Sequence, residues 1–236
     1  MIRLLLLLIL LVPTFADAME MIGFGAADNG YAAQRLYLPG TNATSPTITP
    51  SWEWTTAYGT PVRRYMNSSK ESTYEGQTTY ETYAGWVNFM MRQYISHPLN
   101  GAQTITGTVK GQLIATEYST SANFHWVSKM RVMSGDGTTN RGYLLGETVD
   151  STELNSGKMN RSFLAGNALT SVDAQDGDRI VIDIGIQAQN SSSSSYGVFV
   201  WWRDNGASDL PEDDTDTDET LSSWIEFSQT LNFRGE

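Results

Sequence analysis

The densest group of chemically capable side chains in this sequence is an acidic run over residues 209–219, DLPEDDTDTDE. Carboxylates this closely spaced repel one another unless a cation or solvent screens their charge, and hard oxygen donors suit calcium. We predict a calcium site here as one alternative, and a solvated acidic loop between two late strands as the other. The candidate metal ligands are Asp209, Asp213, Asp214, Asp216 and Asp218.

Aromatic side chains are the second group, with seven tryptophans and eleven tyrosines. An exposed indole or phenol ring offers a flat face to the apolar face of a sugar, whereas the competing interpretation is packing in the core or against another subunit. Trp201 and Trp202 are adjacent in a strand-like run, so one is predicted in the core and the other exposed or at an interface. The candidate ligand-binding residues are Trp52, Trp54, Trp86, Trp201 and Trp202.

Candidate catalytic groups are sparse. Asp183 and Glu226 each sit within an alternating apolar run, and a pair of carboxylates can serve glycoside hydrolysis. Alternation alone also explains them, as outward-facing polar positions. The two histidines, His97 and His125, have no cysteine and no Gly-x-Ser-x-Gly serine to activate. We therefore assign no catalytic residue and predict that the protein is not an enzyme.

Composition excludes further classes of protein. The 236 residues include 15 Lys and Arg against 26 Asp and Glu, which gives a formal net charge of −11. This balance argues against a nucleic-acid partner, because phosphate binding relies on basic side chains. The sequence has no cysteine, which excludes disulfides, zinc fingers and iron–sulfur clusters.

The N-terminus predicts export. Arg3 precedes an apolar run over residues 4–15, and the small residues Ala16 and Ala18 flank Asp17, which is the layout of a secretory signal over residues 1–18. The alternatives are a retained anchor or a start at Met19 or Met21. No later segment is long and apolar enough to span a bilayer. We expect an extracellular or virion location, with residues 19–33 as an extended arm.

Short strand-like runs separated by Gly, Asn, Asp and Ser predict the fold. Residues 176–186, for example, place four isoleucines on one face of a strand. About eight to ten such strands and no alternating helices predict an all-β, single antiparallel β-sandwich, jelly-roll-like, over residues 34–236. The runs cover residues 35–38, 51–56, 83–95, 102–117, 123–133, 142–147, 176–186, 197–203 and 223–233.

Four parts of the chain carry a resemblance to known proteins. They are residues 36–39 (LYLP), residues 97–111 from HPL through GTVKG, residues 175–181 (QDGDRIV), and residues 209–212 with 224–227 (DLPE and WIEF). They resemble a group of uncharacterised β-sandwich proteins of phage and metagenomic origin, which are suspected virion components. The resemblance covers most of the chain from about residue 35, implies a structural role, and assigns no functional residue.

Two functions follow as expectations. The first is a non-enzymatic structural protein that self-assembles or decorates a larger extracellular assembly, such as a virion surface, a fibre or a cell-surface filament. Its partners would be further copies of the chain or other structural subunits. The alternative is a secreted carbohydrate-binding module with a structural calcium ion, whose partners are glycans.

Overall fold

The computed structural model of the chain describes residues 30–38, 42–43, 45–54, 62–82, 84–189, 195–205, 208–215 and 220–235. For residues 72–74 and 203–205 the description covers the backbone alone. The predicted signal over residues 1–18 and the predicted arm up to residue 29 lie outside the described residues. The described residues form thirteen strands, and none of them belongs to a helix that could cross a membrane.

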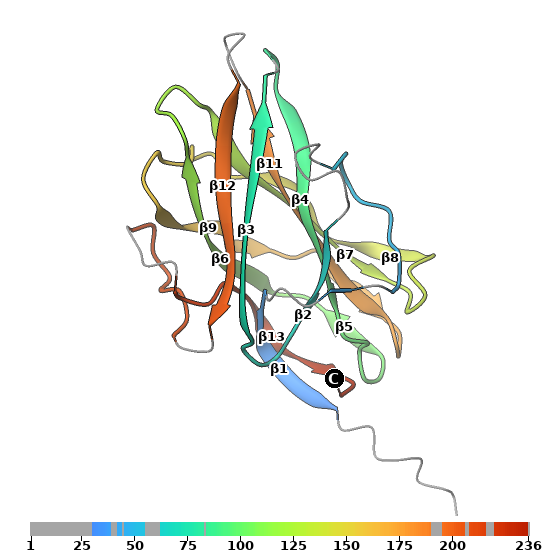
Figure 1. The fold of residues 1–236 in the computed structure, drawn as a ribbon. Helices are drawn as coiled ribbons and strands as arrows, with labels where there is room; N and C mark the ends of the chain where they lie inside the picture. The colour runs from blue at the N-terminus through green and yellow to red at the C-terminus, as the bar shows by residue number, and fades with distance from the viewer. Residues whose placement is uncertain are drawn as a thin grey trace, which may run out of the picture.

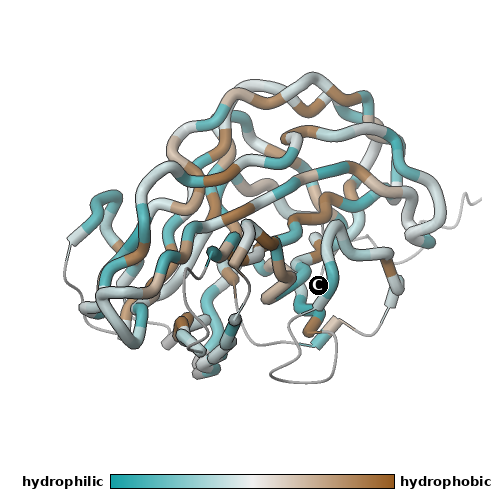
Figure 2. Tube along the Cα trace, turned by 90° about the horizontal axis from the view of Figure 1, so that it is seen from above, coloured by the Kyte–Doolittle hydropathy of each residue, from teal (hydrophilic) through white to brown (hydrophobic). Residues whose placement is uncertain are grey.

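Two β-sheets pack face to face (Figure 1, Figure 2). In sheet A the order is β1, β13, β6, β12, β3, and β9 pairs with the other edge of β6. The strands of sheet A are β1 (Tyr31–Tyr37), β3 (Ser72–Glu81), β6 (Thr108–Glu117), β9 (Met159–Ala168), β12 (Tyr196–Asn205) and β13 (Trp224–Phe233).

Sheet B has five strands in the order β2, β4, β11, β7, β8. They are β2 (Arg63–Met66), β4 (Val87–Ser96), β7 (Phe124–Met133), β8 (Asn140–Val149) and β11 (Arg179–Ala188). β2 runs parallel to β4, and the other pairs in this sheet are antiparallel. A separate two-stranded ribbon joins β5 (Gln103–Ile105) to β10 (Val172–Ala174).

Eight strands of ten residues each build a jelly roll within these sheets. β3, β12, β6 and β9 lie side by side in sheet A, and β4, β11, β7 and β8 lie side by side in sheet B. All these neighbours are antiparallel and the chain crosses repeatedly between the sheets, as in two Greek keys. The predicted all-β antiparallel sandwich is therefore confirmed. There are thirteen strands rather than the predicted eight to ten: β1, β2, β13 and the β5–β10 ribbon add five strands to the eight of the jelly roll.

The core lies between the sheets because each strand turns alternate side chains inward. The four isoleucines of β11 all belong to this core, as their spacing predicts. Trp126 of β7 and Trp202 of β12 meet at its centre, with ring centroids 6.5 Å apart and ring planes at 65°. Both indoles are fully buried, so the two sheets are joined by their largest apolar side chains.

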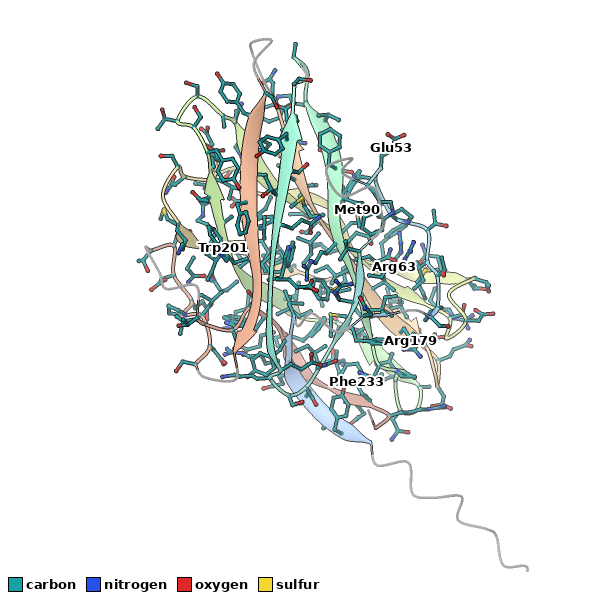
Figure 3. The ribbon with its side chains drawn as sticks, viewed as in Figure 1. Glu53, Arg63, Met90, Arg179, Trp201 and Phe233 are labelled. Carbon is teal, nitrogen blue, oxygen red and sulfur yellow. The ribbon has the colours of Figure 1, made fainter. Side chains whose placement is uncertain are left out.

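The outer faces of the two sheets lie on opposite sides of the molecule. Figure 3 shows Trp201 of sheet A on one side, and Met90 of sheet B with the nearby Glu53 on the other. Residues 45–54 cross the outer face of sheet B: Met90 N donates to Glu53 O at 2.8 Å, and Ser51 N donates to Asp183 Oδ2 at 3.0 Å. This segment covers part of the face and leaves the rest open.

Several predicted strand boundaries are wrong. Residues 51–52 form a bend and Trp54 makes an isolated bridge to Met90, so residues 51–54 are not a strand. The predicted strand over residues 102–117 is two strands, because Gly107 takes a φ of +92° that favours glycine and breaks the ladder. β2, β3, β9 and β10 were not predicted.

The sandwich begins before residue 34. Tyr31, Ala32 and Ala33 pair with Phe233, Asn232 and Leu231 in β13 of the same chain. The last residues of the predicted arm are therefore part of β1, at the edge of the chain's own sheet A.

Candidate functional site

Trp52 and Trp86, two of the predicted ligand-binding residues, lie on the outer face of sheet B. Trp52 belongs to the segment that crosses this face and is half-buried, whereas Trp86 directly precedes β4 and is 51% exposed. The ring of Trp86 meets the ring of His125 at 66°, with 5.4 Å between centroids. His125 points outward, opposite to its two neighbours on β7, as the alternation predicts.

A chain of hydrogen bonds runs from Trp52 to Gln187, on the side of the sheet where Trp86 and His125 lie. Trp52 Nε1 donates to Glu147 Oε2 at 2.8 Å, and Asn88 Nδ2 donates to Glu147 Oε1 at 3.0 Å. Gln187 Nε2 donates to Asn88 Oδ1 at 3.0 Å, and Gln187 lies beside His125 in the ladder between β11 and β7. We call this set the Trp52–Trp86 surface: Trp52, Trp86, Asn88, His125, Glu147 and Gln187.

The polar side chains of the Trp52–Trp86 surface keep hydrogen-bonding capacity for a ligand. Glu147 is exposed and its carboxylate accepts one hydrogen bond at each oxygen, which leaves lone pairs on both. Gln187 Oε1 accepts no hydrogen bond from any described residue. The second amide protons of Asn88 and Gln187 add donors. The surface can therefore both accept from and donate to hydroxyl groups.

Trp54 lies on the same side of the sandwich, over β4. Its backbone bridges to Met90, and the Arg63 guanidinium lies 5.5 Å from the centroid of its ring. The indole is half-buried, so part of its surface is already covered by this cation–π contact. Trp54 supports the course of the crossing segment more directly than it supports a ligand.

The remaining two predicted ligand-binding tryptophans belong to sheet A and do not form a ligand surface. Trp202 is fully buried against Tyr94 and Trp126, so its prediction as a ligand-binding residue is wrong: it packs the core. Trp201 points outward but is only 9% exposed. Its ring packs against Phe199, with 4.4 Å between centroids, and Lys158 Nζ lies 5.1 Å over it. The prediction that the two side chains face opposite ways is confirmed.

Sheet A carries a second exposed aromatic group that the sequence did not single out. Tyr80 and Tyr118 are 53% and 52% exposed, and their ring centroids lie 6.0 Å apart. A Cβ atom at Gly197 of β12 would lie 2.6 Å from Tyr118 Cδ2 and 2.7 Å from Tyr80 Cε1. The absence of a side chain at Gly197 lets both rings lie against the strand. We call these two residues the Tyr80–Tyr118 pair.

A pocket of about 340 Å³ opens on the outer face of sheet B beside Trp52. One wall is the crossing segment, and the other walls come from β7, β8 and the turn between them. We call it the Lys129 pocket. Its lining residues are Ile48, Thr49, Pro50, Ser51, Lys129, Arg131, Met133, Gly137, Thr138, Asn140 and Tyr143.

Asp183 lies behind the Lys129 pocket and is 1% exposed. Its Oδ2 accepts hydrogen bonds from Ser51 Oγ at 2.6 Å and from Ser51 N at 3.0 Å, and it lies 3.3 Å from Arg131 Nη2. Oδ1 accepts from Gln93 Nε2 at 2.8 Å. A buried carboxylate is stable only when paired and hydrogen-bonded in this way, so Asp183 holds the crossing segment and Arg131 in place.

The carboxylate pair considered for glycoside hydrolysis does not exist in the fold. Asp183 is on the outer side of sheet B, and Glu226 is on the outer side of sheet A, where it pairs with Arg35 at 2.6 Å and Lys110 at 3.1 Å. Packed sheets lie roughly 10 Å apart, and the core fills the space between these carboxylates. The two groups cannot flank one glycosidic bond.

The described part of the acidic run does not gather its carboxylates at one point. Asp209 lies 2.6 Å from Arg35 Nη1 and 2.5 Å from Lys70 Nζ. Asp213 accepts from Asn160 Nδ2 and Thr215 Oγ1, while Asp214 accepts from Ser162 N at 2.8 Å. Among the described residues no cluster of three or more metal-ligating side chains occurs. Asp216 and Asp218 lie outside them, so the calcium site stays a prediction.

Comparison with known proteins identifies no family. No family model and no curated protein matches the chain. Among solved structures, an alpha-amino acid ester hydrolase is 11% identical with a TM-score of 0.39, covering 83% of this chain and 36% of the hydrolase. An aminopeptidase from the marine sediment archaeon Thaumarchaeota archaeon is 10% identical with a TM-score of 0.37, covering 88% and 37%.

A virus structure also appears among these likenesses. The structure of infectious bursal disease virus, Gt strain, is 11% identical with a TM-score of 0.23, covering 70% of this chain and 41% of that chain. This chain thus spans less than half of the length of each of these three structures. All of these TM-scores are below 0.5, and a shared fold would not by itself carry a function.

Proposed function

We propose that this protein is a non-enzymatic carbohydrate-binding module, and that the Trp52–Trp86 surface holds the glycan. The observation that carries the proposal is the hydrogen-bond chain from Trp52 through Glu147 and Asn88 to Gln187, with the half-exposed Trp86 beside it. The predicted secretory signal would bring such a module to the extracellular glycans that it binds.

The chemistry of sugars matches the two kinds of group on this surface. A pyranose ring has an apolar face of C–H groups, which gains from covering the exposed indole of Trp86. Its hydroxyl groups are each donor and acceptor, like those of serine. Asn88, Glu147 and Gln187, on β4, β8 and β11, offer amide donors and carbonyl and carboxylate acceptors, so hydrogen bonds to a bound sugar can replace those that these groups make to water.

The preset geometry also favours binding. Each amide or carboxylate is already fixed by its neighbour in the chain, so little side-chain freedom is lost when a ligand arrives. Support from β-strands holds such a group more closely than a loop would. Bond cleavage is not part of the proposal, because Asp183 is paired with Arg131 and its supposed partner Glu226 is on the opposite face.

Retention on immobilised polysaccharides tests the proposal. The protein from residue 19 is passed over a panel of neutral and charged polysaccharides, alone and with Trp86→Ala. We expect Trp86→Ala to weaken retention roughly tenfold or more, as for a well-placed aromatic anchor. Tyr80→Ala is the matched control, since it removes an equally exposed ring from the opposite face. If no polysaccharide retains the protein, or if Trp86→Ala and Tyr80→Ala behave alike, the proposal is wrong.

A second candidate is the structural subunit of an extracellular assembly, and the Tyr80–Tyr118 pair favours it. Two half-exposed rings side by side on a flat sheet face are the kind of group that packs against another protein subunit. Light scattering after size-exclusion chromatography, followed by negative-stain imaging, tests it. Ordered oligomers that disappear in the double variant Tyr80→Ser, Tyr118→Ser support this role, and a monomer at all concentrations contradicts it.

A further inference from the structure

The Lys129 pocket is adjacent to the Trp52–Trp86 surface. Ser51 lines the pocket and the next residue, Trp52, begins the surface. The pocket volume of about 340 Å³ is at the lower end of the range for small-molecule sites. It has room for one sugar unit of a glycan that continues over Trp52.

The charge of the pocket lining is opposite to that of the whole chain. The chain carries a formal charge of −11, yet the lining residues include Lys129 and Arg131 and no Asp or Glu. Lys129 Nζ lies 4.7 Å from the ring centroid of Tyr143 and forms no ion pair with any described carboxylate. This lysine is therefore a half-buried cation that lies over an aromatic ring and outside an ion pair in the described part of the chain.

Arg131 adds a fixed positive charge at the floor of the pocket. Its side chain is 8% exposed, with Nη1 donating to Ser51 Oγ at 3.2 Å and Nη2 facing Asp183 and Thr49 O. Its Nε has no hydrogen-bond partner among the described residues. Asp183 forms its ion pair with this guanidinium and forms none with Lys129, its cross-strand neighbour on β7.

Two further carboxylates lie near Lys129 and form no ion pair with it. Glu147, on β8 beside the residues that pair with Ser128 and Met130, accepts hydrogen bonds from Trp52 and Asn88. Asp136 lies in the turn between β7 and β8, where it accepts hydrogen bonds from Ser134 Oγ, Thr138 N and Thr138 Oγ1. These donors from its own turn satisfy the carboxylate. Tyr143 is 44% exposed and its hydroxyl has no partner among the described residues, so a second donor lies near the Lys129 ammonium.

We propose that the Lys129 pocket binds the carboxylate or sulfate group of an acidic sugar, so that the glycan held by this protein is anionic. The proposal rests on the proposed function and names its ligand class. Lys129 contacts the anion directly, and Tyr143 donates a hydrogen bond to it. The sugar ring carrying the anion lies in the pocket, and the neighbouring units of the glycan extend over Trp52 toward Trp86.

Polysaccharides that differ only in charge test this inference. Polygalacturonate and its methyl ester share one backbone, and dextran sulfate and dextran share another, so the two pairs separate carboxylate from sulfate. We expect at least one anionic member to be retained about tenfold more tightly than its neutral partner, and Lys129→Gln to remove that difference. Added salt weakens the charge-dependent part of the binding.

Lys158→Gln is the matched control. Lys158 also lies over an aromatic ring, at 5.1 Å from Trp201, but on the opposite outer face. We expect this variant to bind as the unchanged protein does. Tyr143→Phe, which keeps the ring under Lys129 and removes the hydroxyl, weakens anionic binding less than Lys129→Gln. Circular dichroism and melting temperature of each variant exclude misfolding as the cause.

The outcomes separate this inference from the proposed function. If Trp86→Ala weakens binding while Lys129→Gln leaves anionic and neutral polysaccharides bound as before, the pocket inference is overturned and the proposed function stands. If Lys129→Gln abolishes anionic binding while Trp86→Ala has no effect, the pocket is supported and the Trp52–Trp86 surface is not. Free galacturonate and sulfate are also titrated into the protein. If neither changes the NMR signals of Lys129 and Tyr143, the inference of anion binding in the Lys129 pocket is overturned.

Discussion

The indole of Trp52 donates a hydrogen bond to Glu147, 95 residues further along the chain, at 2.8 Å. Trp52 is on the segment that crosses sheet B, and Glu147 is on β8 at the edge of that sheet. The same carboxylate accepts from Asn88 on β4. Glu147 therefore ties the crossing segment to the sheet and fixes the orientation of the ring and the amide beside it.

Replacement of this carboxylate gives the first prediction. Glu147→Ala leaves Trp52 Nε1 and Asn88 Nδ2 without their acceptor, and both groups are near solvent and can bind water instead. We expect the melting temperature to change little and glycan affinity to fall about tenfold, because the ring and the amide lose their preset positions. Titration calorimetry with the retained polysaccharide measures the loss. If the variant binds as tightly as the unchanged protein, Glu147 is not part of the glycan site.

Gly185 gives a second prediction, because it lies where β4 carries an extra residue. The ladder pairs Ile184 with Arg92 but Gly185 with Met90, and this bulge sets the register of the Gln187–Asn88 contact. A Cβ at Gly185 would lie 2.3 Å from the backbone oxygen of Phe89. The backbone of β4 cannot relieve this clash by changing rotamer, as a flexible side chain could. We therefore expect Gly185→Ala to lower the free energy of unfolding by about 2 kcal/mol or more.

Urea denaturation of Gly185→Ala against Gly146→Ala checks this expectation. Gly146 has nothing within 4 Å of a Cβ atom, so its substitution should change stability by no more than about 0.5 kcal/mol. Equal midpoints for the two variants would mean that the bulge is not rigid. We also expect Gly185→Ala to weaken glycan binding, since Gln187 and Asn88 shift with the bulge.

The sequence predicts β11, whose inner residues are apolar, and misses β3, whose inner residues are polar. The isoleucines of β11 alternate and were predicted to face the core. β3 reads STYEGQTTYE and shows no such alternation, yet its Gln77, Thr79 and Glu81 are buried. Gln77 fits because its amide donates to Met91 O at 3.1 Å. The hydrogen-bond partner of this buried amide belongs to a strand of the opposite sheet, so the local sequence of β3 cannot indicate it.

In the candidate site too, some residues could be predicted from the sequence and others depend on the tertiary structure. The type of ring at Trp86 was enough to single it out, and alternation placed His125 on the outer side of its strand. Asn88, Glu147 and Gln187 are ordinary polar residues that become a site only because β4, β8 and β11 share a sheet. For Trp201 and Trp202, alternation predicts opposite faces, but which face meets the core depends on the opposing sheet.

The contrast between Trp202 and Trp86 is a third prediction. Trp202→Ala removes a fully buried indole from between Tyr94 and Trp126, and we expect it to cost about 3 to 5 kcal/mol of unfolding free energy. Trp86→Ala removes a half-exposed ring at the surface and should cost less than about 1 kcal/mol. Thermal denaturation of both variants measures the difference. A destabilised Trp86→Ala would mean that this ring serves the fold and would weaken its assignment to a ligand surface.

Glu117, at the end of β6, gives a prediction about pH. Burial of the side chain and, to a smaller extent, the nearby charge of Glu153 raise the pKa of its carboxyl to about 8, against the hydrogen bond from Phe124 N and the charge of Arg161. In the unfolded chain the same group ionises near its ordinary pKa of 4.5. Between pH 4.5 and 8 the unfolded state has therefore lost this proton and the folded state has kept it.

The stability contributed by protonated Glu117 is complete below pH 4.5 and is lost as the pH rises to about 8. The loss amounts to about 3 to 5 kcal/mol. We expect Glu117→Gln, whose amide oxygen can still accept from Phe124 N, to match the unchanged protein at pH 4.5 and to be more stable at pH 8. Glu153→Gln, which removes only the neighbouring charge, should give a smaller gain. The denaturation midpoints of Glu117→Gln and the unchanged protein are measured across this pH range. If their difference does not change with pH, Glu117 ionises normally in the fold.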